Sequence, residues 1–103
     1  MAHNDVVTFY SIERIKDHKK VGRTVERFCT KNDIVGTFFS TPQGVNTTLS
    51  GNKKYLKGLL FLLEKKFHLD LKDQTWSMSQ SLPFKRLKIK CRDRLLPLKG
   101  DFD

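Results

Sequence analysis

The chain has 103 residues, about the length of one domain, and 38% of them are hydrophobic. This composition supports one modest core and differs from that of a disordered chain. Twenty Lys and Arg residues against 11 Asp and Glu residues give a formal net charge of +9. Such a surplus favours an anionic partner, nucleic acid first and an acidic membrane surface second. We expect one domain over residues 1–103.

Two cysteines are too few for a disulfide framework, and neither Cys29 nor Cys91 has the spacing of a zinc or C-x-x-C redox site. Both are expected to be core thiols in a reducing cytoplasm. His18 and His68 also lack partners at the spacing of a metal site or a catalytic triad, so we expect no metal and no cofactor. The sequence has no signal peptide and no apolar run of transmembrane length, which predicts a cytoplasmic protein without a membrane partner.

The first half of the chain predicts a strand, a helix and a β-hairpin. Residues 6–10 are β-branched and aromatic, which favours a strand. Apolar residues recur at helical spacing over residues 17–32, and Asp17 suits the N-cap of that helix. Residues 34–40 and 45–49 predict two strands joined by a Thr-Pro-Gln-Gly turn.

The second half predicts another helix and a basic strand, separated by a connector. An apolar stripe over residues 56–67 indicates the helix, with Ser50 or Asn52 as its cap. Residues 68–82 are polar and are expected to form a connecting loop anchored on the domain by Trp76.

Residues 83–99 alternate between basic and apolar side chains, the pattern of a strand with one wet face and one buried face. Successive side chains on one face of a strand stand about 7 Å apart. A line of cations at this spacing repels itself unless it faces water or a polyanion. We call the cations at the even positions the basic row: Arg86, Lys88, Lys90, Arg92 and Arg94.

The expected order β-α-β-β-α-β is the split arrangement of ferredoxin-like domains. We therefore predict an α+β sandwich in which two helices cover one face of an antiparallel sheet. The other face is open and is expected to carry the basic row. Because the last strand of this fold lies at a sheet edge, two explanations of the row stay open: a phosphate track for RNA, and protection of the edge against aggregation.

Two stretches resemble signatures of a known family. Residues 36–51, G-T-F-F-S-T-P-Q-G-V-N-T-T-L-S-G, resemble the G-T-I-x-x-A-x-E-G-I-N-G-T-I-S-G signature of the rhodanese-related tRNA uridine hydroxylases. Residues 83–90, P-F-K-R-L-K-I-K, resemble the P-F-x-R-L-K-V-K signature of the same family. The chain departs from the first signature at Gln43, where the family usually has Glu, and at Thr47, where it usually has Gly.

This resemblance implies that the chain is the N-terminal domain of that family, with a fold similar to acylphosphatase and ferredoxin-like domains. It also implies a downstream rhodanese-like domain, which bears the catalytic cysteine of a cytoplasmic oxidoreductase that hydroxylates a wobble uridine of tRNA. The chain itself is then expected to be an accessory, non-catalytic domain whose partners are tRNA and the rhodanese-like domain.

The turn within the first signature supplies a second candidate site, formed by Gln43, Gly44 and Asn46. The two amides could contact a base edge or a substrate group, and Gly44 permits the close approach of a backbone. The same residues also suit an ordinary hairpin turn. Of Phe38 and Phe39, alternation places one in the core and the other on the open face. The third strand has no aromatic residue, which argues against base readout in the manner of an RNA-recognition motif.

Two other functions stay open beside RNA binding. The domain could be a structural module that packs on the rhodanese-like domain, or it could hydrolyse acyl phosphates as its fold relatives do. The hydrolase needs a preorganised phosphate cradle, whereas residues 11–15 contain no glycine. Arg14 and Asn46 are the residues that could serve such a reaction.

Overall fold

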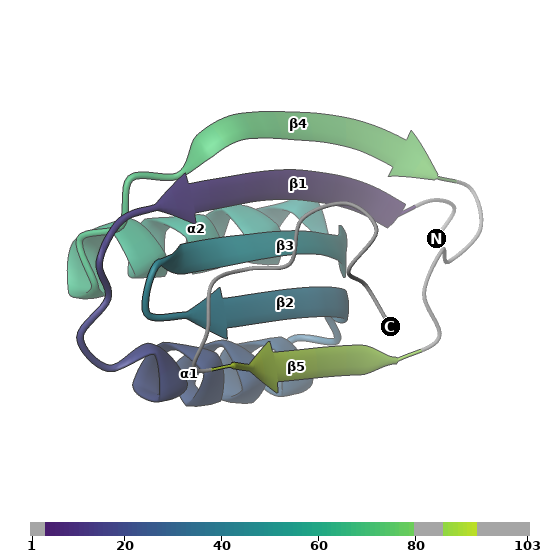
Figure 1. Ribbon diagram of the computed structural model, residues 1–103. Coiled ribbons are helices and arrows are strands. Elements are labelled where there is room, and N and C mark those ends of the chain that lie inside the picture. The colour runs from purple at the N-terminus through teal and green to yellow at the C-terminus, as the bar shows by residue number, and fades with distance from the viewer. Residues whose placement is uncertain (1–3, 80–85, 93–103) are drawn as a thin grey trace, which may run out of the picture.

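A computed structural model describes residues 4–79 and 86–92. These residues form a five-stranded sheet in the order β4-β1-β3-β2-β5 together with two helices. Figure 1 shows both helices on the same face of the sheet, which leaves the other face open. The predicted α+β sandwich is therefore confirmed. Its elements are β1 (Asn4–Ile12), α1 (His18–Lys31), β2 (Val35–Thr41), β3 (Gly44–Gly51), α2 (Lys53–Lys66), β4 (Lys72–Ser79) and β5 (Leu87–Cys91).

The register of the three central strands determines which side chains reach the core. β1 and β2 both pair antiparallel with β3, so that Phe9 and Phe38 lie on either side of Thr47. Both phenylalanines are fully buried beneath the helices. Because side chains alternate along a strand, Phe39 is the one of the two neighbouring phenylalanines that points to the open face.

The two edge strands correct the predicted element order. The stretch 68–82, expected to be a loop, contains β4, which pairs antiparallel with β1 at one edge of the sheet. The basic strand is instead a fifth strand, β5, which pairs in parallel with β2 at the other edge. The sheet is therefore mixed, and not wholly antiparallel. Of the predicted stretch 83–99, residues 83–85 and 93–99 lie outside the described residues.

Both helices begin at residues that the sequence indicates. The Asp17 side chain caps α1 by accepting a hydrogen bond from the backbone N–H of Lys20 at 3.1 Å. Asn52 caps α2 by accepting from the N–H of Lys54 at 2.9 Å. A cap of this kind satisfies an N–H group that has no partner within the first turn, and stabilises a helix by about 1 kcal/mol.

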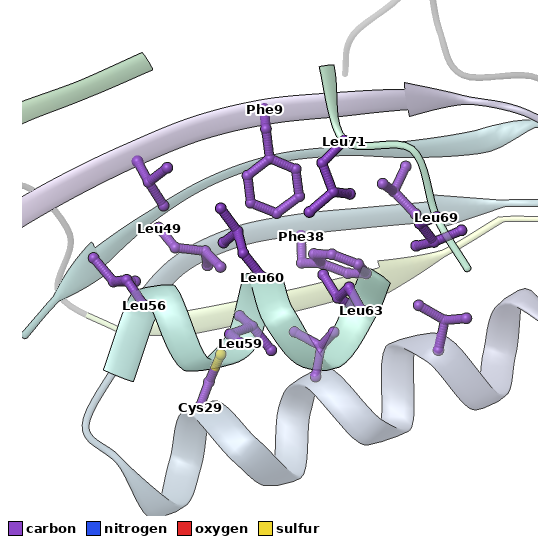
Figure 2. Packing of buried hydrophobic residues seen from close by; sticks show 14 of the residues in the cluster. Phe9, Cys29, Phe38, Leu49, Leu56, Leu59, Leu60, Leu63, Leu69 and Leu71 are labelled. Atoms are coloured by element: carbon purple, nitrogen blue, oxygen red, sulfur yellow. The ribbon is translucent and has the colours of Figure 1, made fainter. Parts of the chain in front are cut away.

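The core fills the space between the helices and the sheet (Figure 2). Trp76 of β4 is half-buried and packs against this cluster, with the ammonium of Lys53 5.6 Å from the centre of its indole. It anchors the domain, as expected, although it does so from a strand. The helices contribute Val21, Val25 and Cys29 from α1, and Leu56, Leu59, Leu60 and Leu63 from α2.

β5 packs closely on α1 at Gly22. A Cβ atom at this glycine would lie 2.4 Å from the Sγ of Cys91 and 3.4 Å from the Cγ2 of Ile89. Gly22 costs the helix about 1 kcal/mol relative to Ala, but it lets the basic strand approach. Because the odd-numbered side chains of β5 face α1, the even-numbered side chains face the open side of the sheet.

Candidate nucleic-acid interface

Four members of the basic row are described, and they follow the β5 edge of the sheet: Arg86, Lys88, Lys90 and Arg92. The two lysines belong to the strand, and the exposed arginines stand at its two ends. At the rise of a strand the four positions span about 20 Å. The fifth member, Arg94, lies outside the described residues.

Backbone hydrogen bonds to β2 hold both arginines in line with the strand. The N–H of Gly36 donates to the carbonyl of Arg86 at 3.2 Å, and the N–H of Arg92 donates to the carbonyl of Ser40 at 2.9 Å. The basic row is therefore carried by one continuous extended segment, and strand geometry sets the spacing of its cations.

Charge is distributed unevenly between the two edges of the sheet. Within the described part of the chain, no acidic side chain forms a salt bridge with the basic row. At the opposite edge, Asp73 belongs to β4 and Asp70 precedes it, and the carboxylate of Asp70 contacts the ammonium of Lys72 at 2.8 Å. A polyanion on the open face is thus attracted more strongly to the β5 edge than to the β4 edge, where the cation is paired with an acid.

A line of four side chains crosses the open face and meets the basic row. Asn46 of β3 pairs in register with Tyr10 of β1 on one side and with Phe39 of β2 on the other. Phe39 in turn pairs with Lys90 of β5. The ammonium of Lys90 lies 5.7 Å from the centre of the Phe39 ring, a cation–π contact. We call this line, Tyr10–Asn46–Phe39–Lys90, the transverse row.

The structure separates the three residues of the predicted turn site. Asn46 is exposed on the open face, and its side-chain amide bonds to no other described residue. Gln43 is exposed in the turn, where its N–H donates to the Thr41 hydroxyl at 3.1 Å. Gly44 has a φ of +146°, and a Cβ atom there would lie 2.0 Å from the Ser11 carbonyl oxygen. The β1–β3 pairing therefore requires Gly44, and of the three residues only Asn46 belongs to the transverse row.

Tyr10 stands at the acidic end of the transverse row, beside Asp73. A hydrogen bond to the Asp73 carboxylate, together with the negative charge of that group, raises the pKa of the Tyr10 hydroxyl. The pairing of β1 with β4 shifts register between Thr8 and Tyr10, and Asp73 has a φ of +51° near this shift. The irregularity in the β1–β4 pairing thus lies beside Tyr10.

The loop between β1 and α1 borders a cavity of about 480 Å³. A hydrolase of acyl phosphates would need its phosphate-binding amides in this loop. Two backbone donors of this loop are already used, because Glu13 N–H donates to the Gln43 carbonyl at 3.0 Å and Ile15 N–H donates to the Pro42 carbonyl at 2.8 Å. Arg14 lines the cavity. The cavity is also lined by Lys16, Lys20 and Lys66 and by the carboxylates of Glu13 and Asp17. A phosphate there would meet mobile side-chain cations rather than a cradle of these two backbone amides.

The described residues contain no group of three or more His, Cys, Asp or Glu side chains that could hold a metal ion. Burial raises the pKa of the Cys29 thiol to about 12, so this cysteine stays protonated at neutral pH. Neither described helix is long and apolar enough to cross a membrane.

The sequence predicted the basic row and a phenylalanine on the open face, but it did not indicate that Phe39, Lys90 and Asn46 lie side by side. That adjacency depends on β5 lying beside β2, which was not predicted because no residue pattern specifies the neighbour of an edge strand. The alternation over residues 34–40 and 83–99 was the available signal for which side chains share the open face.

Comparisons with known proteins point to one family. A protein of Ehrlichia ruminantium named tRNA uridine(34) hydroxylase is 30% identical over 99 residues, which are 95% of this chain and 36% of the relative. A protein of Picosynechococcus with the same name is 31% identical over 97 residues, covering 90% of this chain and 31% of the relative. The chain thus spans about a third of the length of these curated relatives.

The fold has solved counterparts as well. The acylphosphatase of Bacillus subtilis aligns with a TM-score of 0.55 over 86% of this chain and 98% of that protein, at 16% identity, which shows the fold alone. A family profile described as the UPF0176 acylphosphatase-like domain matches residues 4–95. Because this profile covers most of the chain, the chain belongs to the UPF0176 acylphosphatase-like domain family, whose curated relatives here are named tRNA uridine(34) hydroxylase.

Proposed function

We propose that this chain is an accessory, tRNA-binding domain of a larger cytoplasmic enzyme that hydroxylates uridine 34 of tRNA. The oxidoreductase chemistry takes place in a separate rhodanese-like domain of the full-length protein. The observation that carries the proposal is the basic row, which is fixed along one strand edge without a described acidic partner. The name of the curated relatives supplies tRNA as the polyanion.

The basic row acts by binding phosphates. Each lysine or arginine that neutralises a phosphate releases condensed counterions, so the affinity falls steeply as the salt concentration rises. For a single-stranded segment, each contact contributes about 0.7 to the slope of log affinity against log salt. Four contacts therefore contribute a slope of about 3, which is large enough to measure.

The test is tRNA binding by the 103-residue chain across a salt series. In the row variant, the four described cations are replaced by Gln. A charge-matched control replaces four exposed cations on the helix face: Arg23, Arg27, Lys31 and Lys57. We expect the row variant to lose both affinity and about three units of slope, while the control loses little of either. Equal losses in the two variants would mean that only net charge matters, and unchanged binding by the row variant would leave edge protection as the role of the row.

A second function, packing on another domain, is favoured by exposed apolar side chains on α2. Phe61 is 62% exposed and Tyr55 is 39% exposed, although both lie on an otherwise lysine-rich helix. A structural module would bind no tRNA at any salt concentration. Its Phe61→Ser variant would instead weaken association with the remainder of the full-length protein, measured with the two parts as separate chains.

A further inference from the structure

We infer that the transverse row seats an unpaired nucleotide of the bound RNA, with its base stacked on Phe39, the edge of the base at Asn46 and its phosphate at the β5 cations. This inference rests on the proposed function and deepens it, because it names the substrate class: single-stranded rather than duplex RNA.

The Phe39 ring does not contribute to the hydrophobic core. Its neighbour Phe38 is fully buried and fills the space beneath the sheet, while Phe39 is half-buried on the open face. An aromatic ring in this position gives any base a flat apolar surface, and stacking is the usual way in which proteins hold unpaired bases.

Lys90 connects the ring to the basic row. Its ammonium lies 5.7 Å from the ring centre in the absence of RNA. Because the ammonium is carried on a flexible four-carbon stem, it can leave the ring for a phosphate when a base takes its place. The same lysine thus covers the ring in the free protein and neutralises the backbone in the complex.

Asn46 stands one strand farther from β5, about 5 Å from Phe39. Its exposed amide offers both a donor and an acceptor, and it bonds to no other described side chain or backbone group. A base stacked on Phe39 would therefore bring its hydrogen-bonding edge to this amide. A duplex cannot do so, because its bases are paired and stacked inside the helix.

The unequal charge of the two sheet edges determines which edge the phosphate faces and which way the base points. Cations without a described acidic partner line the β5 edge, whereas at the β4 edge Lys72 is paired with Asp70, and Asp73 follows it. The phosphates are therefore drawn to β5 and the bases point inward across β2 and β3. Tyr10 follows on β1, about 10 Å from Phe39, and offers a ring for a second base. The two rings flank β3, so the missing aromatic residue on β3 does not prevent stacking.

The experiment compares Phe39→Leu with the same substitution at an exposed phenylalanine on the helix face, Phe61→Leu. The probes are a hairpin RNA with an unpaired loop, an unstructured oligouridine and a fully paired RNA duplex. Stacking of one base is worth roughly a five- to 150-fold change in affinity. We expect Phe39→Leu to lose this factor for the two unpaired probes, to keep the salt slope, and to leave duplex binding unchanged. Phe61→Leu should behave as wild type.

A fluorescence variant detects the stacked base directly. Trp76 is the only tryptophan in the chain, so Trp76→Phe combined with Phe39→Trp places the single indole on the open face. Oligouridine should quench this indole and the duplex should not. Asn46→Ala should weaken binding to the unpaired probes while the quenching persists at saturation.

The outcomes distinguish failure of the stacking site from failure of tRNA binding. If wild type binds RNA through the basic row but Phe39→Leu binds the hairpin equally well and the indole is not quenched, the stacking site is refuted and the proposed function stands. If wild type binds none of the probes and no tRNA, both are refuted. Thermal unfolding of Phe39→Leu near the wild-type temperature verifies that a loss of affinity is not a loss of fold.

Discussion

The packing of β5 on α1 determines whether an alanine at position 22 stabilises or destabilises the chain. In a Gly22→Ala variant, the new Cβ would lie 2.4 Å from the Sγ of Cys91. Favourable contacts between such atoms lie near 3.5–4.0 Å, so either the Cys91 side chain must rotate within the packed interface or helix and strand must separate by about 1 Å. Overpacking of this kind costs about 1–3 kcal/mol. Replacement of Gly by Ala inside a helix raises the free energy of unfolding by about 1 kcal/mol through helix propensity, which offsets part of this cost.

We therefore expect Gly22→Ala to lower the free energy of unfolding by up to about 2 kcal/mol. Cys91→Ala removes the sulfur and makes room for the methyl group. In that background the same Gly22→Ala substitution should raise stability by about 1 kcal/mol. The coupling energy between the two positions, measured by a double-mutant cycle in urea or guanidinium, is then about 1–3 kcal/mol.

Gly58→Ala on α2 is the matched control. A Cβ atom at Gly58 would meet only the Cζ of Phe28, at an ordinary 3.5 Å, so this variant should gain about 1 kcal/mol from helix propensity. If Gly22→Ala stabilises the chain as much as Gly58→Ala does, or if Cys91→Ala leaves its effect unchanged, the close approach of β5 to α1 is refuted. The same variant tests function, since a displaced β5 should also weaken tRNA binding through the basic row.

Two further predictions concern buried positions. Because burial raises the pKa of Cys29 to about 12, the folded state keeps a proton that the unfolded thiol loses near pH 8.5. The free energy of unfolding should therefore fall as the pH rises from about 9 toward 12. A Cys29→Val variant, whose stability is measured by denaturation at each pH, should lack this part of the decrease. The same pH dependence in the variant and the wild type would contradict the prediction. Gly44→Ala should destabilise the chain by roughly 1–3 kcal/mol, because its Cβ would overlap the Ser11 carbonyl at a φ of +146°. Wild-type stability of that variant in the same assay would show that the hairpin can re-form around a side chain.

The elements that could be predicted from the sequence are those whose residue pattern is imposed by the core. The leucines of α2 recur at the helical period because one face of the helix covers the sheet, and all four of its buried positions are leucine. The caps Asp17 and Asn52 are equally local, since each bonds to an N–H two or three residues away. Local patterns of this kind do not depend on which strands pair.

β4 could not be predicted because little of it faces the core. Trp76 is half-buried, whereas Met78 is 66% exposed and Lys72 and Asp73 face solvent. What holds the strand is its backbone pairing with β1, which extends from Asn4 to Tyr10. A polar edge strand of this type has no apolar alternation, and its sequence resembles that of a loop.

The unpredicted position of β5 changes the chemistry of the open face. At the edge beside β1, the basic row would take the place of β4, with two strands between its cations and Phe39. At the edge beside β2, Lys90 lies next to Phe39, and three strands separate the cations from the β4 edge. The separation gives the open face a cationic edge, a central aromatic ring with an exposed amide, and a far edge where Lys72 is paired with Asp70. The inferred binding of an unpaired nucleotide rests on this ordering rather than on the net charge of +9.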